Sequence, residues 1–272
     1  MNHLSDHLTL NDLKIISKTL VPNYRDREKL YKTIREDEEI LRKMLSDNRL
    51  FVHIMNNPNS YMEISPTLLF SILLRHMRDE IKKHAYTFEN KDGESVVIFD
   101  AKDILNLLEK EEALDYLTEL LVSFTRIHSF STMHRIRKGI WRRLKYSDFD
   151  IDSLIRFSKT IDEKLRFRPF KKVADICLFI LGIFPEYIEK HEWPLSFGDR
   201  RLASHPEIRK IGFENYGSYY YQKASNMETA YTLGLHDLLN YFSENFKIAE
   251  KTLNYLTSRY LGFHDKKKLF PL

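Results

Sequence analysis

The apolar run VADICLFILGIF, residues Val173–Phe184, decides the fold. It is apolar on every side of a helix wheel except at Asp175, and this pattern is typical of a helix enclosed by neighbouring helices. The run has 12 residues, whereas a membrane-spanning helix needs about 20. We therefore expect a central helix buried in a protein core.

The composition of the whole chain favours helices in the same way. Only 8 glycines and 8 prolines occur in 272 residues, so few turns can be formed, and long helices are expected rather than many short strands. With 43% hydrophobic and 30% charged residues the chain can form a sizeable core. We predict an all-α, bundle-like fold with helices near residues 8–20, 25–47, 65–84, 100–126, 132–146, 151–165, 170–184, 204–225, 227–243 and 245–261.

One β-hairpin is expected near residues 85–100. The segments HAYTFEN and ESVVIFD flank Lys91-Asp92-Gly93, and Asp-Gly is a favoured hairpin turn because glycine accepts a positive φ. We predict an N-terminal helical part, residues 1–125, that contains this hairpin, and a C-terminal helical part, residues 126–272. The two parts could also form one continuous domain.

Positive charge is concentrated in residues 126–172, which we call the basic block. It holds 14 basic and 5 acidic side chains, whereas residues 1–125 hold 17 and 22. Its centre is RIRKGIWRRLKY, residues 135–146, and at 100° per residue this segment predicts an amphipathic helix with one basic face. The predicted anion-binding residues are Arg135, Lys138, Arg142, Lys145, Arg156, Arg166 and Arg168.

Three interpretations of the basic block remain open. It can be only the solvated face of a helix. Because lysine and arginine neutralise phosphates and aromatic rings stack on bases, it can also bind nucleic acid. An acidic protein or another phosphorylated ligand is the third possibility.

Asp175 and the tyrosine-rich segment GSYYYQ, residues 217–222, indicate a second candidate site. A buried carboxylate needs a partner, for which Arg166, Arg168, Arg200 and Arg201 are candidates. We expect Asp175 to be a buried, paired carboxylate, and structural hydrogen bonds to explain the tyrosines. The alternative is a ligand pocket formed by Asp175, Trp193, Arg201, Tyr216, Tyr219 and Tyr220.

No signature of catalysis, cofactor binding or metal binding occurs. His76, Glu80 and His84 share one helix stripe, but the Glu-x-x-His repeats of a di-iron bundle are absent, so we expect no metal there. The segment SDFDIDS, residues 147–153, lacks the glycine and the final glutamate of a calcium loop. The one cysteine, Cys177, lies in the apolar run and is expected to be an inert thiol. We expect no cofactor.

The segments DICLFILGIFPEYI, GSYYYQKA and ISPTLLFSILLR resemble those of an uncharacterised bacterial family of helical proteins of unknown function. The resemblance implies a bacterial, soluble and mostly helical protein, and it brings no activity and no catalytic residues. Without a secretory signal the protein is expected to be cytoplasmic and not bound to a membrane. Nothing in the sequence indicates an oligomeric state.

The expected function is that of a non-enzymatic binding or regulatory module whose basic 126–172 face meets an anionic partner, either nucleic acid or an acidic protein. The alternative is a helical enzyme or sensor that binds a small ligand or a metal in the C-terminal part.

Overall fold

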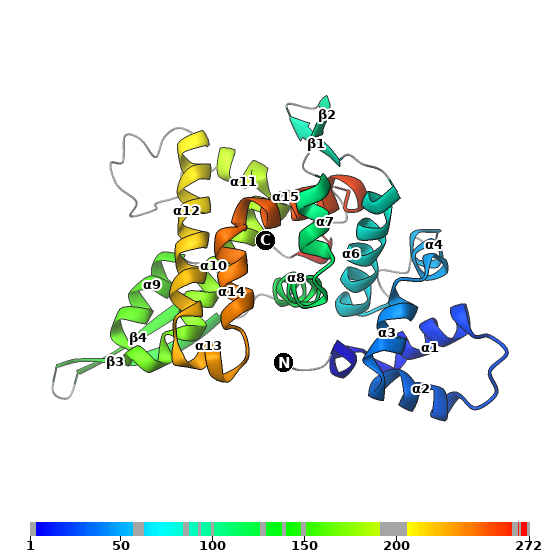
Figure 1. The fold of residues 1–272 in the computed structure, drawn as a ribbon. Coiled ribbons are helices and arrows are strands. Elements are labelled where there is room, and N and C mark those ends of the chain that lie inside the picture. Colours follow the sequence, from blue (N-terminus) through cyan, green and yellow to red (C-terminus); the bar gives the residue numbers. More distant parts are fainter. Residues whose placement is uncertain are drawn as a thin grey trace. The chain divides into compact units, whose positions relative to one another are not determined.

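The structure is a computed structural model that describes residues 4–56, 63–83, 87–91, 94–98, 101–125, 129–137, 140–147, 151–190, 206–262, 266 and 268–270. These residues are predominantly helical, as the predicted all-α class requires (Figure 1). The chain divides into two compact units. The first unit is Met1–Thr125 with Ser258–Gly262, and the second is Arg126–Thr257 with Phe263–Leu272.

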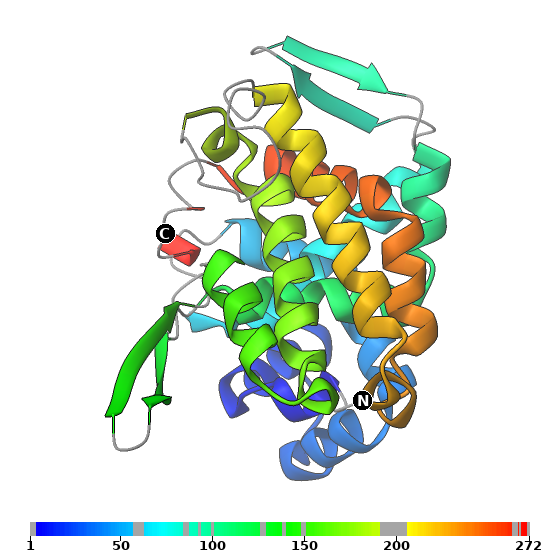
Figure 2. The same cartoon turned by 90° about the vertical axis from the view of Figure 1, so that its left-hand side faces the viewer.

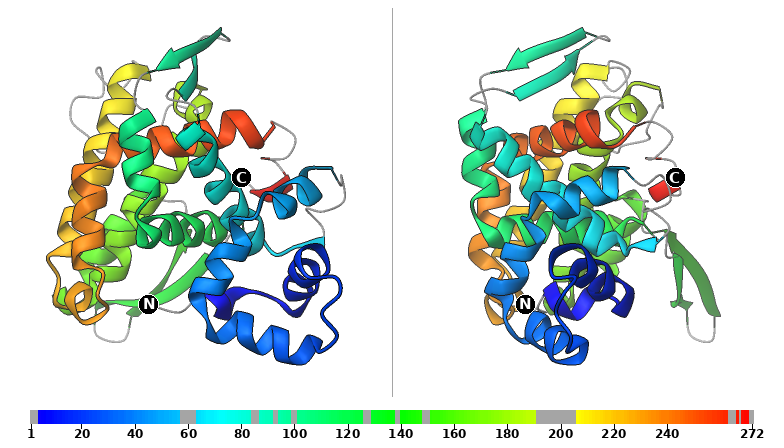
Figure 3. Two further views of the ribbon diagram at one scale, coloured as in Figure 1. Left: turned by 45° about the vertical axis from the view of Figure 1, so that its right-hand side comes forward. Right: turned by 90° about the vertical axis from the view of Figure 1, so that its right-hand side faces the viewer.

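The first unit consists mainly of short helices. In chain order they are η1 (Leu4–His7), α1 (Leu10–Leu20), α2 (Arg27–Glu36), α3 (Glu38–Leu45), α4 (Asn48–Asn56), α6 (Pro66–Lys83), α7 (Ala101–Leu108) and α8 (Glu111–Ser123) (Figure 3). Strands β1 (Thr87–Lys91) and β2 (Glu94–Ile98) lie between α6 and α7 and pair antiparallel. Helix α6 forms much of the core, since its residues from Thr67 to Arg75 are buried.

Capping residues decide where these helices begin and end. The predicted start of α6 is confirmed, because the Leu68 backbone N–H donates to Oγ of Ser65 at 3.1 Å. The predicted single helix over residues 25–47 is wrong, since Asp37 divides it into α2 and α3. Asp37 has extended backbone angles, and its carboxylate accepts a 3.0 Å hydrogen bond from the Ile40 N–H and thus caps α3. The helix predicted near 100–126 is likewise divided into α7 and α8.

The second unit begins with two strands and continues with helices. Its elements are β3 (Ser129–Arg137), β4 (Ile140–Ser147), α9 (Ile151–Thr160), η2 (Glu163–Leu165), α10 (Phe167–Ile183), α11 (Pro185–Lys190), α12 (Pro206–Ser225), α13 (Glu228–Thr232), α14 (His236–Glu244) and α15 (Phe246–Tyr260). The last turn of α15, from Ser258, is counted with the first unit.

Helix α10 is the buried centre of the second unit. Every residue from Val173 to Ile183 is buried, so the central helix predicted from the apolar run is confirmed. Two glycines allow close packing around it. A Cβ on Gly182 would lie 2.4 Å from Cβ of Leu253 on α15, and a Cβ on Gly217 of α12 would lie 2.2 Å from the ring of Phe246. A larger side chain at Gly217 would therefore force the Phe246 ring to move, and one at Gly182 would force the backbone of α15 at Leu253 to move.

The helix predicted near residues 132–146 is wrong. This segment forms strands β3 and β4, which pair antiparallel from Ser129↔Ser147 to Arg137↔Ile140 with an irregularity between Arg135 and Arg137. The connection is Lys138-Gly139, and a two-residue connection with glycine favours a tight hairpin over a continuous helix. Figure 2 shows the ribbon, in dark green, projecting past the helices of its own unit.

Candidate functional site

The β3–β4 ribbon contains the centre of the basic block. Residues directly opposite each other in an antiparallel pair share a face, and successive residues alternate between faces. The register therefore places positions 131, 133, 135, 141, 143 and 145 on one face and positions 130, 132, 134, 142, 144 and 146 on the other. The first face is occupied in sequence by Ser, Met, Arg, Trp, Arg and Lys, and the second by Phe, Thr, His, Arg, Leu and Tyr.

This register changes which of the predicted anion-binding residues belong together. Positions Arg135 and Lys145 share the first face, and Arg143, which the helix wheel did not select, joins them. Position Arg142 lies on the opposite face, and Lys138 falls outside the described residues. We call the first face, with positions Arg135, Trp141, Arg143 and Lys145, the cationic ribbon face.

The helical part of the basic block adds exposed cations. Arg156 on α9 is exposed and donates a 3.3 Å hydrogen bond to Oγ of Ser153. Arg168, at the start of α10, is exposed, whereas Arg166 is half-buried and donates to the carbonyl of Ile161 at 3.4 Å. Of the three arginines predicted here to bind anions, Arg156 and Arg168 thus present their side chains to solvent, and Arg166 holds the η2 turn.

Asp175 is the buried and paired carboxylate that the sequence predicts. Only 4% of it is exposed. Its Oδ1 accepts a 2.9 Å hydrogen bond from the phenol of Tyr221, and its Oδ2 accepts a 2.8 Å hydrogen bond from Nζ of Lys171. The expected arginine partners Arg166 and Arg168 do not take this role, and Arg200 and Arg201 lie outside the described residues.

Sequence reasoning missed Tyr221, although a signal for it existed. Tyr221 lies four residues after Gly217, and residues four apart share a helix face. A glycine inside a helix often marks a close contact with a neighbouring helix. The helix face that carries Gly217 and Tyr221 is therefore expected to pack against α10, and a Cβ on Gly217 would lie 3.1 Å from Cβ of Cys177 on that helix. The predicted pocket residues Tyr216, Tyr219 and Tyr220 lie on the same helix, while Trp193 and Arg201 are outside the described residues.

Cys177 lies beside this carboxylate and is inert. It is fully buried, and burial together with the negative charge of Asp175 raises the pKa of its thiol far above the ordinary range. A thiol that does not ionise is not a nucleophile.

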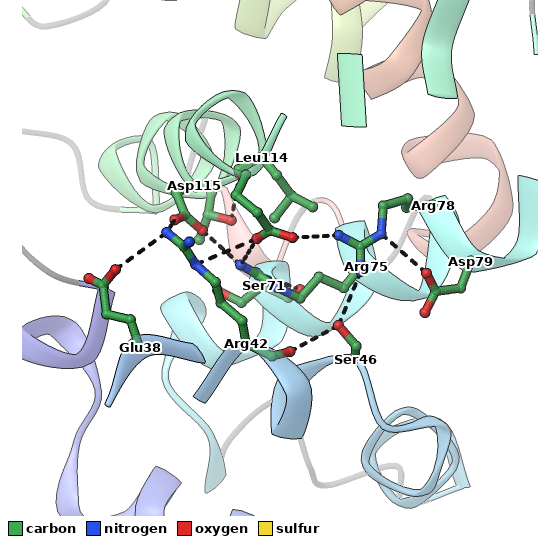
Figure 4. A network of polar contacts seen from close by, with 11 residues as sticks. Glu38, Arg42, Ser46, Ser71, Arg75, Arg78, Asp79, Leu114 and Asp115 are labelled. Atoms are coloured by element: carbon green, nitrogen blue, oxygen red, sulfur yellow. Dashed lines mark hydrogen bonds and ion pairs between the residues drawn. The ribbon is translucent and has the colours of Figure 1, made fainter. Parts of the chain in front are cut away.

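The first unit contains a network of charged side chains that sequence reasoning missed (Figure 4). Arg75 on α6 is completely buried, and its Nη2 donates 2.9 Å hydrogen bonds to both Glu111 and Asp115 of α8. Arg78 donates to Glu111 at 2.6 Å, and Arg42 of α3 donates to Asp115 at 3.2 Å. The network thus joins α3, α6 and α8 by charge-assisted bonds.

Glu111, the carboxylate that Arg75 and Arg78 share, stays ionised near pH 7. Burial acts to raise the pKa of Glu111, but the charges of Arg75, Arg78 and Arg42 outweigh it, and the pKa is lowered overall. Two buried polar atoms, Nε of Arg75 and Oγ of Ser71, have no hydrogen-bond partner among the described residues. The only sequence signal was an arginine in the otherwise apolar start of α6, LLFSILLR.

The stripe of His76, Glu80 and His84 has a structural role in the described residues. The His76 ring stacks on Phe51, with ring centroids 3.4 Å apart, and Glu80 accepts hydrogen bonds from Arg259, at 3.0 Å, and from the phenol of Tyr260. Both oxygens of Glu80 are therefore engaged, while His84 lies outside the described residues. Burial lowers the pKa of His76, so its imidazole is neutral near pH 7.

Neither a metal site nor a membrane helix emerges from the part of the chain that the structure describes. No group of three or more histidine, cysteine, aspartate or glutamate side chains could hold a metal ion there. No described helix is both long enough and apolar enough to cross a bilayer. Comparisons with protein families, curated proteins and solved structures find no match to this chain.

Proposed function

We propose that this protein is a non-enzymatic module that binds nucleic acid through its basic block. The observation that carries the proposal is the β3–β4 register, which brings positions Arg135, Arg143 and Lys145 onto one face with Trp141. A ribbon face on which cationic positions predominate can contact phosphates.

The spacing of the cations favours phosphates over a scattered acidic surface. Alternate residues of a strand, such as Arg143 and Lys145, are about 6.8 Å apart along the chain. Phosphates repeat about every 3.4 Å along the axis of one DNA strand. Positions Arg143 and Lys145 can therefore reach two separate phosphates of one backbone, and the exposed Arg156 and Arg168 add further positive charge in the same block.

Electrostatic complementarity supports the same partner. The basic block carries an excess of nine positive charges, with 14 basic and 5 acidic residues, whereas residues 173–272 are balanced with 12 of each. Such a concentrated charge gives sequence-independent affinity, because each phosphate that is neutralised releases bound counterions. Aromatic residues within the block can add stacking on bases.

The test is a titration of fluorescently labelled DNA and RNA, single- and double-stranded, at several salt concentrations. We expect binding at low salt that weakens steeply as salt rises. The triple change Arg135→Glu, Arg143→Glu and Lys145→Glu should abolish binding or reduce the salt slope by about 3. Circular dichroism checks that the variant remains folded.

A matched control separates the ribbon from the net charge. Lys14, Lys29 and Lys102 are exposed lysines outside the basic block, and changing all three to glutamate alters the charge by the same amount. This control should bind nearly as well as the native protein. The proposal is wrong if no nucleic acid binds at low salt, or if the control loses as much affinity as the ribbon variant.

A further inference from the structure

The second unit holds a cluster of aromatic rings where α10 meets α12. The buried Tyr220 lies at its centre, with the ring of Phe170 at 5.5 Å, that of Tyr216 at 5.7 Å and that of Tyr219 at 5.3 Å. Tyr220 is 7% exposed, but Tyr219 is 47% exposed. The cluster therefore ends at the surface in one large ring that is open to solvent.

The Tyr219 ring is held in position by its neighbours. It meets Tyr220 edge to face, with an angle of 81° between the ring planes. The ammonium of Lys223, one turn further along α12, lies 4.8 Å from the centroid of the Tyr219 ring and 5.4 Å from that of Phe170. Cation–π attraction holds lysine and ring together. An exposed ring that is fixed in this way loses little entropy when a flat ligand stacks on it.

We propose that Tyr219 and Lys223 form a stacking platform for an unpaired base, so that the ligand of this protein is single-stranded nucleic acid. The inference rests on the proposed function. It adds a site outside the basic block and specifies the class of nucleic acid. The base stacks on the exposed part of the Tyr219 ring, beside the ammonium of Lys223, which lies close enough to attract a phosphate.

Charge and chemistry both favour this occupant. Exposed aromatic rings beside cations are the means by which proteins bind single strands without regard to sequence, since every base has a π face. In a duplex these faces are covered by neighbouring bases. The platform also lies next to the basic block, because the Lys223 ammonium is 5.4 Å from the ring of Phe170, a residue of the block two positions after the exposed Arg168.

The experiment compares two oligonucleotides that carry the same phosphates. One is a labelled thymidine 20-mer, and the other is a 20-mer of the same backbone in which abasic sites replace the central bases. Native protein should bind the first about 5- to 150-fold more tightly, as expected for the stacking of one base. Tyr219→Leu should remove this difference, while Tyr219→Phe, which keeps the ring, should preserve it.

Controls and outcomes keep the two proposals separate. Tyr231→Leu removes another exposed tyrosine of the same unit, 57% exposed, and should leave the preference unchanged. Lys223→Gln should weaken binding of both oligonucleotides. Two results would overturn the stacking platform alone, provided that the ribbon variant still loses affinity. One is equal binding of both oligonucleotides by the native protein, and the other is an unchanged preference in Tyr219→Leu. Absence of binding to every oligonucleotide would overturn the proposed function as well.

Discussion

The phenol of Tyr221 donates a 2.9 Å hydrogen bond to Oδ1 of Asp175, and this bond joins α12 to the buried helix α10. Lys171 completes the pairing from one turn earlier on α10. Both carboxylate oxygens thus have donors from the chain itself, which explains how a charged group can occupy the centre of an apolar helix.

Removing either end of this bond should destabilise the second unit. We expect Tyr221→Phe and Asp175→Leu each to lower the free energy of unfolding by about 1–3 kcal/mol, because each leaves a buried polar partner unsatisfied. Asp175→Asn should cost less. Urea denaturation followed by tryptophan fluorescence checks this, since Trp141 and Trp193 both belong to the second unit. A clear stabilisation by Asp175→Leu would instead indicate that Asp175 is kept for function.

Arg75 should be the most sensitive position of the charged network in the first unit. Arg75→Met removes the buried guanidinium that Glu111 and Asp115 share. We expect the free energy of unfolding to fall by about 3–5 kcal/mol. Arg49→Met is the matched control, because the ion pair of Arg49 with Asp47 lies at the surface and should contribute far less. Hydrogen exchange of α6 and α8 measures both, and equal effects of the two changes would refute the prediction.

Two steps of acid destabilisation are expected in the first unit. Because the pKa of His76 is lowered in the folded protein, the unfolded chain binds a proton at this histidine more readily than the folded chain does. The free energy of unfolding should therefore be highest above about pH 6.5 and should decrease as the pH falls below that value. The lowered pKa values of Glu111 and Glu80 give a second loss below about pH 4.3.

The variant His76→Phe isolates the first of these steps. The substituted ring can still stack on Phe51 but has no proton to gain. Urea midpoints at pH 7, 6 and 5, followed by circular dichroism, should fall for the native protein and stay level for the variant. A native protein whose midpoint is the same at pH 7 and pH 5 would contradict the assignment.

Gly217 and Gly212 on α12 provide a matched pair for close packing. A methyl group at Gly217 would overlap the Phe246 ring, whereas a methyl group at Gly212 meets no neighbouring atom within 4 Å in the described part of the chain. Gly217→Ala should therefore lower the free energy of unfolding by about 1–3 kcal/mol through overpacking. Gly212→Ala should raise it by about 0.5–1 kcal/mol, because alanine favours a helix interior more than glycine does. Thermal unfolding of the two variants should shift in opposite directions.

The sequence predicts the buried helix correctly because its evidence is local. The twelve-residue run Val173–Phe184, apolar except for Asp175, predicts a buried helix in a helical fold, and Ser65 before Pro66 defines the start of α6 through one hydrogen bond. The ribbon was missed for an equally physical reason. Ile136, Ile140 and Leu144 are spaced by four residues. This spacing is compatible with one face of a helix and also with one face of a strand, on which every second residue lies. Only Gly139 indicates a hairpin rather than a helix.

The charged network could not be predicted, because its partners are distant in sequence. Arg75 meets Glu111 and Asp115 across 36 and 40 residues, and no pattern within one helix specifies which carboxylate will face it. The same holds for Tyr221 and Asp175, 46 residues apart. Helix periodicity predicts which side chains are buried. Which polar groups pair with each other depends on how the helices pack, and this is not visible in the sequence of one helix.

The glycines at 182 and 217 imply a constraint on how this protein can evolve. Since each lies where a neighbouring helix leaves no room for a Cβ, a larger residue at 217 would require a smaller side chain at 246, and a larger residue at 182, which would meet the Cβ of Leu253, would require glycine at 253. The solvent-facing residues of α9 and α12 carry no such restriction. In diverged relatives, we therefore expect residue 182 to change only together with residue 253, and residue 217 only together with residue 246. This covariation would identify relatives even after most surface residues have changed.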